Sequence, residues 1–315
     1  MTEFAVDSSR LPGPGSAAGA LAGGVGCAGE TIPAEPGRSG PVRAWLRFFR
    51  SELRLVFGRR RNLWLLAVVA VFPVIIGIAM RLATDSGHAG GPSVAYINQL
   101  AGNGIFLSFI ALSLLLVLVM PLAVAVVSGD SIAGEAGYGT LRHLLAAPVG
   151  RTRILTVKYA VIVVFALAVA FAVAGVALAT GAVLFPFGPV TLLSGTTVPL
   201  ADGIVRLLFV TLYVAAAMAS LGAIGLALST FTGHAIGAIA ALAFVVVISE
   251  VLDNVPQFAV IHPYLPTHWW NSFDALLRMP ADTGTLLHGL LSFGVYLLLA
   301  GSAAWARLST VDVTS

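Results

Sequence analysis

The sequence predicts an all-α, polytopic membrane protein with six transmembrane helices. Of its 315 residues, 58% are hydrophobic and only 10% are charged, and the mean hydropathy is +0.96. The apolar residues form runs of roughly twenty, the length that an α-helix needs to cross about 30 Å of hydrocarbon. A barrel strand would show roughly ten residues of alternation instead, so porin-like folds are excluded.

Residues 1–40 are rich in Gly, Ala, Pro and Ser and show no hydrophobic periodicity. Such a composition does not bury a core, so we expect a disordered cytoplasmic tail. A single six-helix transmembrane domain is expected over residues 41–310, followed by a short cytoplasmic C-terminus at residues 311–315. Cys27 is the only cysteine, which excludes an intramolecular disulfide and a cysteine-based metal site.

The stretch from Pro41 to Arg61 predicts an amphipathic helix that lies in the membrane interface. Arginines recur there at steps of three and four residues, and aromatic and aliphatic residues fill the other face. The apolar face would lie at the acyl boundary, and the arginines would contact anionic headgroups. The residues expected to anchor this helix are Arg43, Trp45, Arg47, Arg50 and Arg54.

Six runs that are almost free of charge are long enough to be transmembrane helices. They lie near Asn62–Met80, Ile105–Val127, Tyr159–Leu184, Leu207–Ser229, Ala235–Leu252 and Leu286–Ala306. After the third run, prolines and glycines over residues 181–199 make a further helix implausible. Between the fourth and fifth runs, the polar segment Ser229–His234 indicates a tight helical hairpin.

The distribution of basic residues predicts the orientation. If both termini are cytoplasmic, 14 of the 17 basic residues lie on the cytoplasmic side, and only Arg81, Arg206 and Arg278 lie outside. The opposite orientation would reverse this bias and contradict the positive-inside rule. We therefore expect a multi-pass protein of the cell membrane with both termini in the cytoplasm.

The polar block Gly129–Lys158 lies between the second and third runs and faces the cytoplasm in this orientation. Within it, Thr140–Ala147 can form a short helix with its leucines on one face, and Pro148 would end that helix. A rigid element of this kind could dock on a cytosolic partner. Asp130 and Glu135 are interpreted as salt-bridge partners rather than as an acid–base pair, because carboxylates beside a basic loop usually have that role.

The same block contains, in order, an acidic residue, the sequence Gly-Thr-Leu-Arg, a leucine pair, a proline, an arginine and a distal lysine. This pattern resembles the loop between the second and third spans of type 2 ABC exporter permeases, the membrane subunits that pair with a separate ATP-binding protein. The interfacial helix, the six spans and the turn between spans four and five fit the same family. The residues that match its coupling helix and flanks are Glu135, Gly139, Thr140, Leu141, Arg142, Leu144, Leu145, Pro148, Arg151 and Lys158.

The resemblance implies a permease subunit of an ATP-binding cassette transporter that exports a hydrophobic or amphipathic substrate. A separate subunit would bind and hydrolyse ATP with Mg, and this chain would bind no cofactor, because it has no Walker A sequence. We expect a homodimer, or a heterodimer with a second permease, in the lipid bilayer and without a nucleic-acid partner. No catalytic residue and no metal site are expected.

A second cluster lies between the fifth and sixth runs, on the side expected to be outside. Glu250, His262 and Trp269 are candidates for lining an outer exit. The more ordinary interpretation of the aromatic residues here is an interfacial belt, with prolines that shape a re-entrant or surface segment. Two loosely spaced histidines without a nearby cysteine are too few for a metal site.

Other functions remain open at this point. The loop arginines alone could serve only to fix topology. The whole chain could be a secondary transporter or a non-transport membrane enzyme. The first would normally show internal repeats and ionisable residues near the midplane, and the second would need polar catalytic groups at membrane depth. The spans show neither feature, which mildly favours a permease whose energy comes from a partner.

Overall fold

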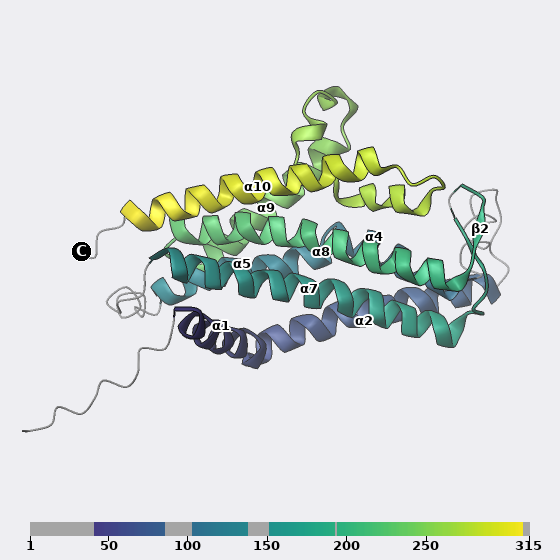
Figure 1. Ribbon diagram of the computed structural model, residues 1–315, viewed down its shortest axis with the longest axis horizontal. Helices are drawn as coiled ribbons and strands as arrows, with labels where there is room; N and C mark the ends of the chain where they lie inside the picture. The colour runs from purple at the N-terminus through teal and green to yellow at the C-terminus, as the bar shows by residue number, and fades with distance from the viewer. Residues whose placement is uncertain (1–40, 86–102, 138–150, 193, 311–315) are drawn as a thin grey trace, which may run out of the picture. The chain divides into compact units, whose positions relative to one another are not determined.

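Long α-helices occupy the positions of the apolar runs in the computed structural model (Figure 1). The structure describes residues 41–85, 103–137, 151–192 and 194–310, which all belong to one compact unit. Its helices are α1 (Pro41–Gly58), α2 (Arg60–Asp85), α4 (Gly104–Leu116), α5 (Val119–Gly137), α7 (Arg151–Leu184), α8 (Leu200–Phe231), α9 (Ala235–Asp253) and α10 (Thr283–Thr310). Two short strands are β1 (Val190–Thr191) and β2 (Thr197–Val198), and three 3₁₀ helices are η1 (Pro256–Phe258), η2 (His262–Tyr264) and η3 (Trp270–Leu277).

The prediction of an all-α polytopic membrane protein is confirmed. Five helices of the described residues, α2, α7, α8, α9 and α10, are each long and apolar enough to cross a membrane. Some begin earlier than the apolar runs predicted, because hydropathy marks only the part of a helix that meets lipid. The basic first turns of α7, from Arg151, continue the same helix beyond it.

The second predicted span, Ile105–Val127, is not one straight helix. It consists of α4 and α5, which meet at a break after Leu116 with a bend of 55°. Pro121 accounts for the break, because it has no N–H to donate and its ring clashes with the carbonyl four residues earlier, at Val117. Counted as one bent span, the pair brings the number of candidate spans to six.

The centre of the bundle is formed by α4, α7 and α8. In the most apolar part of α8, 72% of residues are buried, against 17% in α2, so α8 is an inner helix and α2 an outer one. The largest fully buried side chains include Phe165, Leu112 and Met218. The outer helices α2, α9 and α10 keep apolar residues exposed, as expected where lipid replaces water as the surrounding medium.

α4 and α7 cross in contact at two glycines. A Cβ atom on Gly104 would lie only 2.6 Å from the carbonyl oxygen of Gly181, closer than real Cβ atoms come. The two backbones therefore touch, which only glycine permits at this crossing. Nearby, Asn103 begins α4 by accepting from the amide of Ile105 at 3.3 Å, and its side-chain amide donates to the carbonyls of Gly188 and Pro189 at 3.0 Å each.

The described residues of the connection between α7 and α8, 185–192 and 194–199, contain no further helix, as the prolines and glycines predicted. They form a small antiparallel hairpin instead, in which Val190 pairs with Val198 and Thr191 with Thr197. Gly195 in its turn has φ of +79°, a conformation that favours glycine. The predicted hairpin of spans four and five is also present, since α8 ends at Phe231 and α9 begins at Ala235.

Candidate functional site: a polar network where three helices meet

A polar network lies where α1, α5 and α7 come together, next to the predicted coupling segment. α5 ends at Gly137 and α7 begins at Arg151, so these two helices flank residues 138–150. Seven of the predicted coupling residues lie outside the described part of the chain, namely Gly139, Thr140, Leu141, Arg142, Leu144, Leu145 and Pro148. Arg151 is described only as the first residue of α7. The structure does place Glu135 and Lys158.

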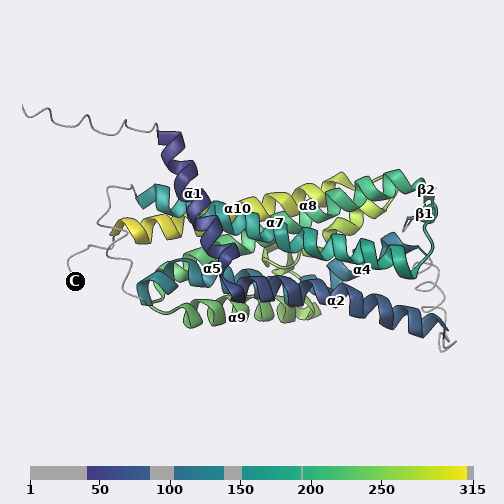
Figure 2. The same cartoon turned by 90° about the horizontal axis from the view of Figure 1, so that it is seen from below.

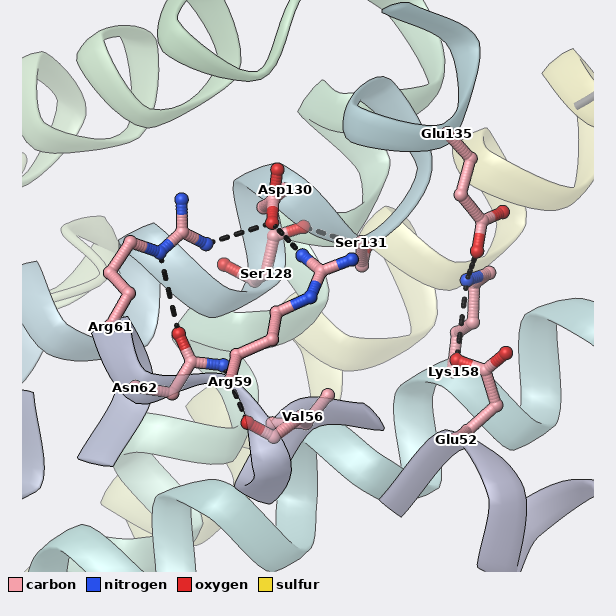
Figure 3. A network of polar contacts seen from close by, with 10 residues as sticks. All are labelled: Glu52, Val56, Arg59, Arg61, Asn62, Ser128, Asp130, Ser131, Glu135 and Lys158. Atoms are coloured by element: carbon pink, nitrogen blue, oxygen red, sulfur yellow. Dashed lines mark hydrogen bonds and ion pairs between the residues drawn. The ribbon is translucent and has the colours of Figure 1, made fainter. Parts of the chain in front are cut away.

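Lys158 joins three helices through one ammonium group (Figure 3). Its Nζ donates to Oε1 of Glu135 on α5 at 2.6 Å and lies 3.5 Å from Oε2 of Glu52 on α1. The lysine side chain is 3% exposed, whereas Glu52 and Glu135 are 12% and 20% exposed. A lysine this deeply buried needs opposite charge beside it, because removing an ammonium group from water without a partner is very costly. We call Glu52, Glu135 and Lys158 the lysine triad.

A second ion cluster fixes the corner between α1 and α2. Arg59 and Arg61 both contact Oδ2 of Asp130 on α5, at 2.5 Å and 2.8 Å. Asp130 is 11% exposed, but the arginines are 42% and 49% exposed, so water screens this cluster more than the lysine triad. Asn62 is buried beside it and donates to the carbonyl of Val56 at 2.9 Å, near the end of α1.

The two clusters line a common cavity of about 40 Å³ between α1, α2, α5 and α7. Three acidic side chains from two helices face three basic ones across it, so the cavity is close to neutral overall. Its volume suits a few water molecules and no larger ligand. The arrangement therefore connects helices to one another and leaves no room for a ligand. Both acidic residues of the polar block, Asp130 and Glu135, take part in ion pairs, as interpreted from the sequence.

The predicted anchoring residues lie on α1, which crosses the direction of α2 and α7 at a steep angle (Figure 2). Arg43, Arg47, Arg50 and Arg54 are all exposed. Trp45 is half-buried and stacks on Phe49 with ring centroids 5.2 Å apart. Farther along, Phe57 packs against Phe165 of α7 at 6.0 Å, so part of the apolar face is occupied by protein.

The candidates for an outer exit lie at the end of α9 and in the segment between α9 and α10. His262 is half-buried, and its Nε2 donates to the carbonyl of Val255 at 3.2 Å. Trp269 donates to the carbonyl of Pro263 at 3.0 Å and stacks on His288 at 5.7 Å. Glu250 is half-buried near the end of α9 and bonds with the Thr267 side chain. All three residues have structural partners, and their role at an exit stays a prediction.

Sequence reasoning missed one member of these polar clusters. Glu52 lies on the buried face of an otherwise basic amphipathic helix, three residues after Phe49 and four before Val56. A lone carboxylate on the apolar face of a helix is the signal that could have indicated a buried cationic partner. On the outer side, Oδ1 of Asp253 lies 2.6 Å from Nδ1 of His268. Among the described residues, no three His, Cys, Asp or Glu side chains group as metal ligands.

Comparison with known proteins indicates one family. The family model described as "ABC-2 family transporter protein" matches residues 56–276. A protein of Stutzerimonas stutzeri named "Probable ABC transporter permease protein NosY" is 38% identical over 142 residues, which are 41% of this chain and 46% of that protein. Its namesake from Pseudomonas aeruginosa is 36% identical over 101 residues, 31% of this chain and 32% of that protein. The chain thus spans less than half the length of these relatives.

Proposed function

Since the chain belongs to the ABC-2 family of transporter proteins as a permease subunit, we propose that it exports a hydrophobic or amphipathic substrate with energy from a separate ATP-binding subunit. ATP and Mg would be bound by that partner and not by this chain. The permease would work as a homodimer or with a second permease, in the cell membrane. The charge bias along the sequence supports a cytoplasmic location for both termini.

The lysine triad is the observation that supports this proposal most directly. Glu135 and Lys158 belong to the two helices that flank residues 138–150, and Glu52 adds the transverse helix α1. Because one buried ammonium group joins all three, the ends of α5 and α7 are held together. A displacement of the segment between them would therefore move α5 and α7 together, because the two helices could not slide past each other.

The predicted coupling helix provides the surface to which such a force would be applied. Leu141, Leu144 and Leu145 would share one face of a helix over Thr140–Ala147, and an apolar helix face suits a hydrophobic groove on a partner protein. ATP-driven closure of the partner would then shift the balance between inward-facing and outward-facing arrangements of the spans.

The interior of the bundle supports the proposed class of substrate. The buried residues of α4, α7 and α8 are nearly all apolar. Apart from Lys158, which is paired in the lysine triad, their polar members are Ser and Thr whose hydroxyls bond mostly to nearby carbonyls, such as Thr211 to Leu207 at 2.7 Å. Away from that triad, such an interior offers no charged group that could bind an ion. It favours a hydrophobic or amphipathic molecule.

Co-purification tests the proposed coupling. The chain would be expressed with the ATP-binding protein encoded by a neighbouring reading frame, together with Leu141→Asp/Leu145→Asp and the control Ser194→Asp. Ser194 is exposed in the β1–β2 turn, so the control adds a carboxylate far from the segment along the chain. We expect the control to retain the partner and the double variant to lose it while eluting as a folded protein on size exclusion.

Three results would contradict the proposal. The first is retention of the partner by the double variant, because docking would then occur elsewhere. The second is robust ATP hydrolysis by the isolated chain. The third is transport by the chain alone in proteoliposomes that contain no nucleotide-hydrolysing protein.

A further inference from the structure

An apolar groove of about 370 Å³ separates α10 from α7 and α8. It is lined by residues of all three helices, among them Val163 and Leu167 of α7, Leu212 and Ala216 of α8, and Leu290 and Gly294 of α10. All of these residues lie well inside the spans, away from the helix ends. The volume is at the lower end of the range of roughly 300–1,000 Å³ that is typical of small-molecule sites.

Two contacts attach α10 to its neighbours, one beyond the inner end of the groove and one in its wall. Near the inner end of α10, as oriented above, Trp305 donates to the hydroxyl of Thr152 at 3.2 Å. Toward its outer end, Phe293 packs against Tyr213 of α8 at 5.3 Å. Between them α10 has Gly294, where an added Cβ would meet no atom within 4 Å. Small residues in the walls of the groove therefore leave space that no side chain of the described residues fills.

The rim of the groove is continuous with the lipid-facing surface. Leu212 and Leu290 at the rim are 41% and 47% exposed, and the adjoining outer face of α10 exposes Leu291 and Leu298 at 58% and 73%. A cavity lined by apolar side chains does not hold water stably. At membrane depth the surrounding medium is hydrocarbon, so an acyl chain is the available molecule that matches the lining. An acyl chain is a narrow, flexible file of methylene groups, so it can enter a groove of about 370 Å³ and contact its apolar lining.

We propose that this groove binds one acyl chain of a bilayer phospholipid, which completes the packing of α10 against α7 and α8. The site requires neither the ATP-binding subunit nor a transported substrate, so it goes beyond the function proposed above. Gly294 and Ala216 determine the site, because a large side chain at either position would fill the groove. Gly301, on the same helix, also has open space around it but does not line the groove, which makes it a matched control.

Photolabelling in nanodiscs tests this proposal with the full-length chain. The probe is a phosphatidylglycerol with a diazirine at the middle of one acyl chain, diluted into unlabelled phosphatidylglycerol, and labelled peptides are mapped by mass spectrometry. We expect labelling of the groove peptides of α8 and α10 above that of the lipid-facing residues of α2 in the wild type and in Gly301→Phe. In Gly294→Phe it should fall to the level of α2.

Ala216→Phe fills the groove from the opposite wall, so it provides the same test if Gly294→Phe does not fold. The proposal is overturned if the wild-type groove is labelled no more than α2, whether because it is empty or because a second copy covers it. It is overturned equally if a folded groove-filling variant retains full labelling. Loss of labelling in Gly301→Phe as well would also refute it, because the effect would then not be specific to the groove.

Discussion

Replacing Lys158 with methionine tests whether the lysine triad holds α1, α5 and α7 together. Methionine preserves much of the volume and removes the ammonium group, so Glu52 and Glu135 lose the cation that they share. Two carboxylates at this site would repel each other and would have lost the partner that offsets their desolvation. We expect the inner end of the bundle to be destabilised.

The burial of the triad determines the expected magnitude. Removing one partner of a fully buried ion pair costs roughly 3–5 kcal/mol, whereas an exposed pair contributes about 0–1 kcal/mol. Lys158 is 3% exposed, but its carboxylates are 12% and 20% exposed, so some water reaches them. The loss should therefore lie between these limits and nearer the upper one, at about 2–4 kcal/mol.

Thermal unfolding in detergent at a fixed heating rate measures this loss. A drop in midpoint of roughly 5–10 °C is expected from the usual relation between free energy and midpoint for domains of this size. Arg59→Met is the control, because it removes an equally short contact to a carboxylate from a side chain that is 42% exposed. Adding Glu52→Gln and Glu135→Gln to Lys158→Met should restore most of the midpoint. Equal midpoints for Lys158→Met and Arg59→Met, or no recovery in the triple variant, would refute the role assigned to the triad.

Three further outcomes follow from other contacts. Gly181→Ala should lower the unfolding midpoint by the equivalent of about 1–3 kcal/mol, because its Cβ would meet the backbone of Gly104, whereas Gly175→Ala on the same helix should be neutral or slightly stabilising. Hydrogen bonds from the Thr285 hydroxyl and amide hold the pKa of Asp282 below its ordinary value of 3.8. The ionised carboxylate therefore stabilises the start of α10 at any pH above 3.8. This stabilisation is lost as the pH falls through the lowered pKa. Hydrogen exchange should show less protection of the first turn of α10 at about pH 3 than at pH 6 in the wild type, and no such change in Asp282→Asn. Tyr213→Phe should cost about 1 kcal/mol and speed exchange in η3, because it removes the 2.8 Å hydrogen bond to the carbonyl of Trp269; unchanged exchange there would contradict this.

The part of the fold that the lipid environment determines, the transmembrane helices, could be predicted from the sequence. Runs such as Tyr159–Leu184 must be helical in hydrocarbon, since no other local structure satisfies the backbone, and the structure confirms them. The break before Pro121 could not be predicted in the same way. Pro73 has the same chemistry inside α2, yet α2 continues through it. Whether a proline bends a helix depends on neighbouring packing, which composition and periodicity do not report.

Only part of the polar network could be predicted from the sequence. Glu135 and Lys158 belong to a local pattern and could be selected from it. Their third partner, Glu52, lies more than eighty residues away from Glu135 in the sequence, and only the folding of α1 across α7 brings it near. Similarly, Asp130 was expected in a salt bridge, but its partners Arg59 and Arg61 come from the corner between α1 and α2 and not from the adjacent loop. Long-range pairing of this kind is decided by tertiary packing.

The bend between α4 and α5 means that the second span does not have to move as one piece. The outer half, α4, is held by its glycine crossing with α7, while the inner half, α5, contains the carboxylates that contact Lys158, Arg59 and Arg61. With the helix interrupted at residues 117 and 118, α5 can tilt about that point and leave α4 seated. In the function proposed above, a push on the cytosolic end of this span would change the angle between α5 and α4, so the displacement need not be the same in the two halves of the membrane.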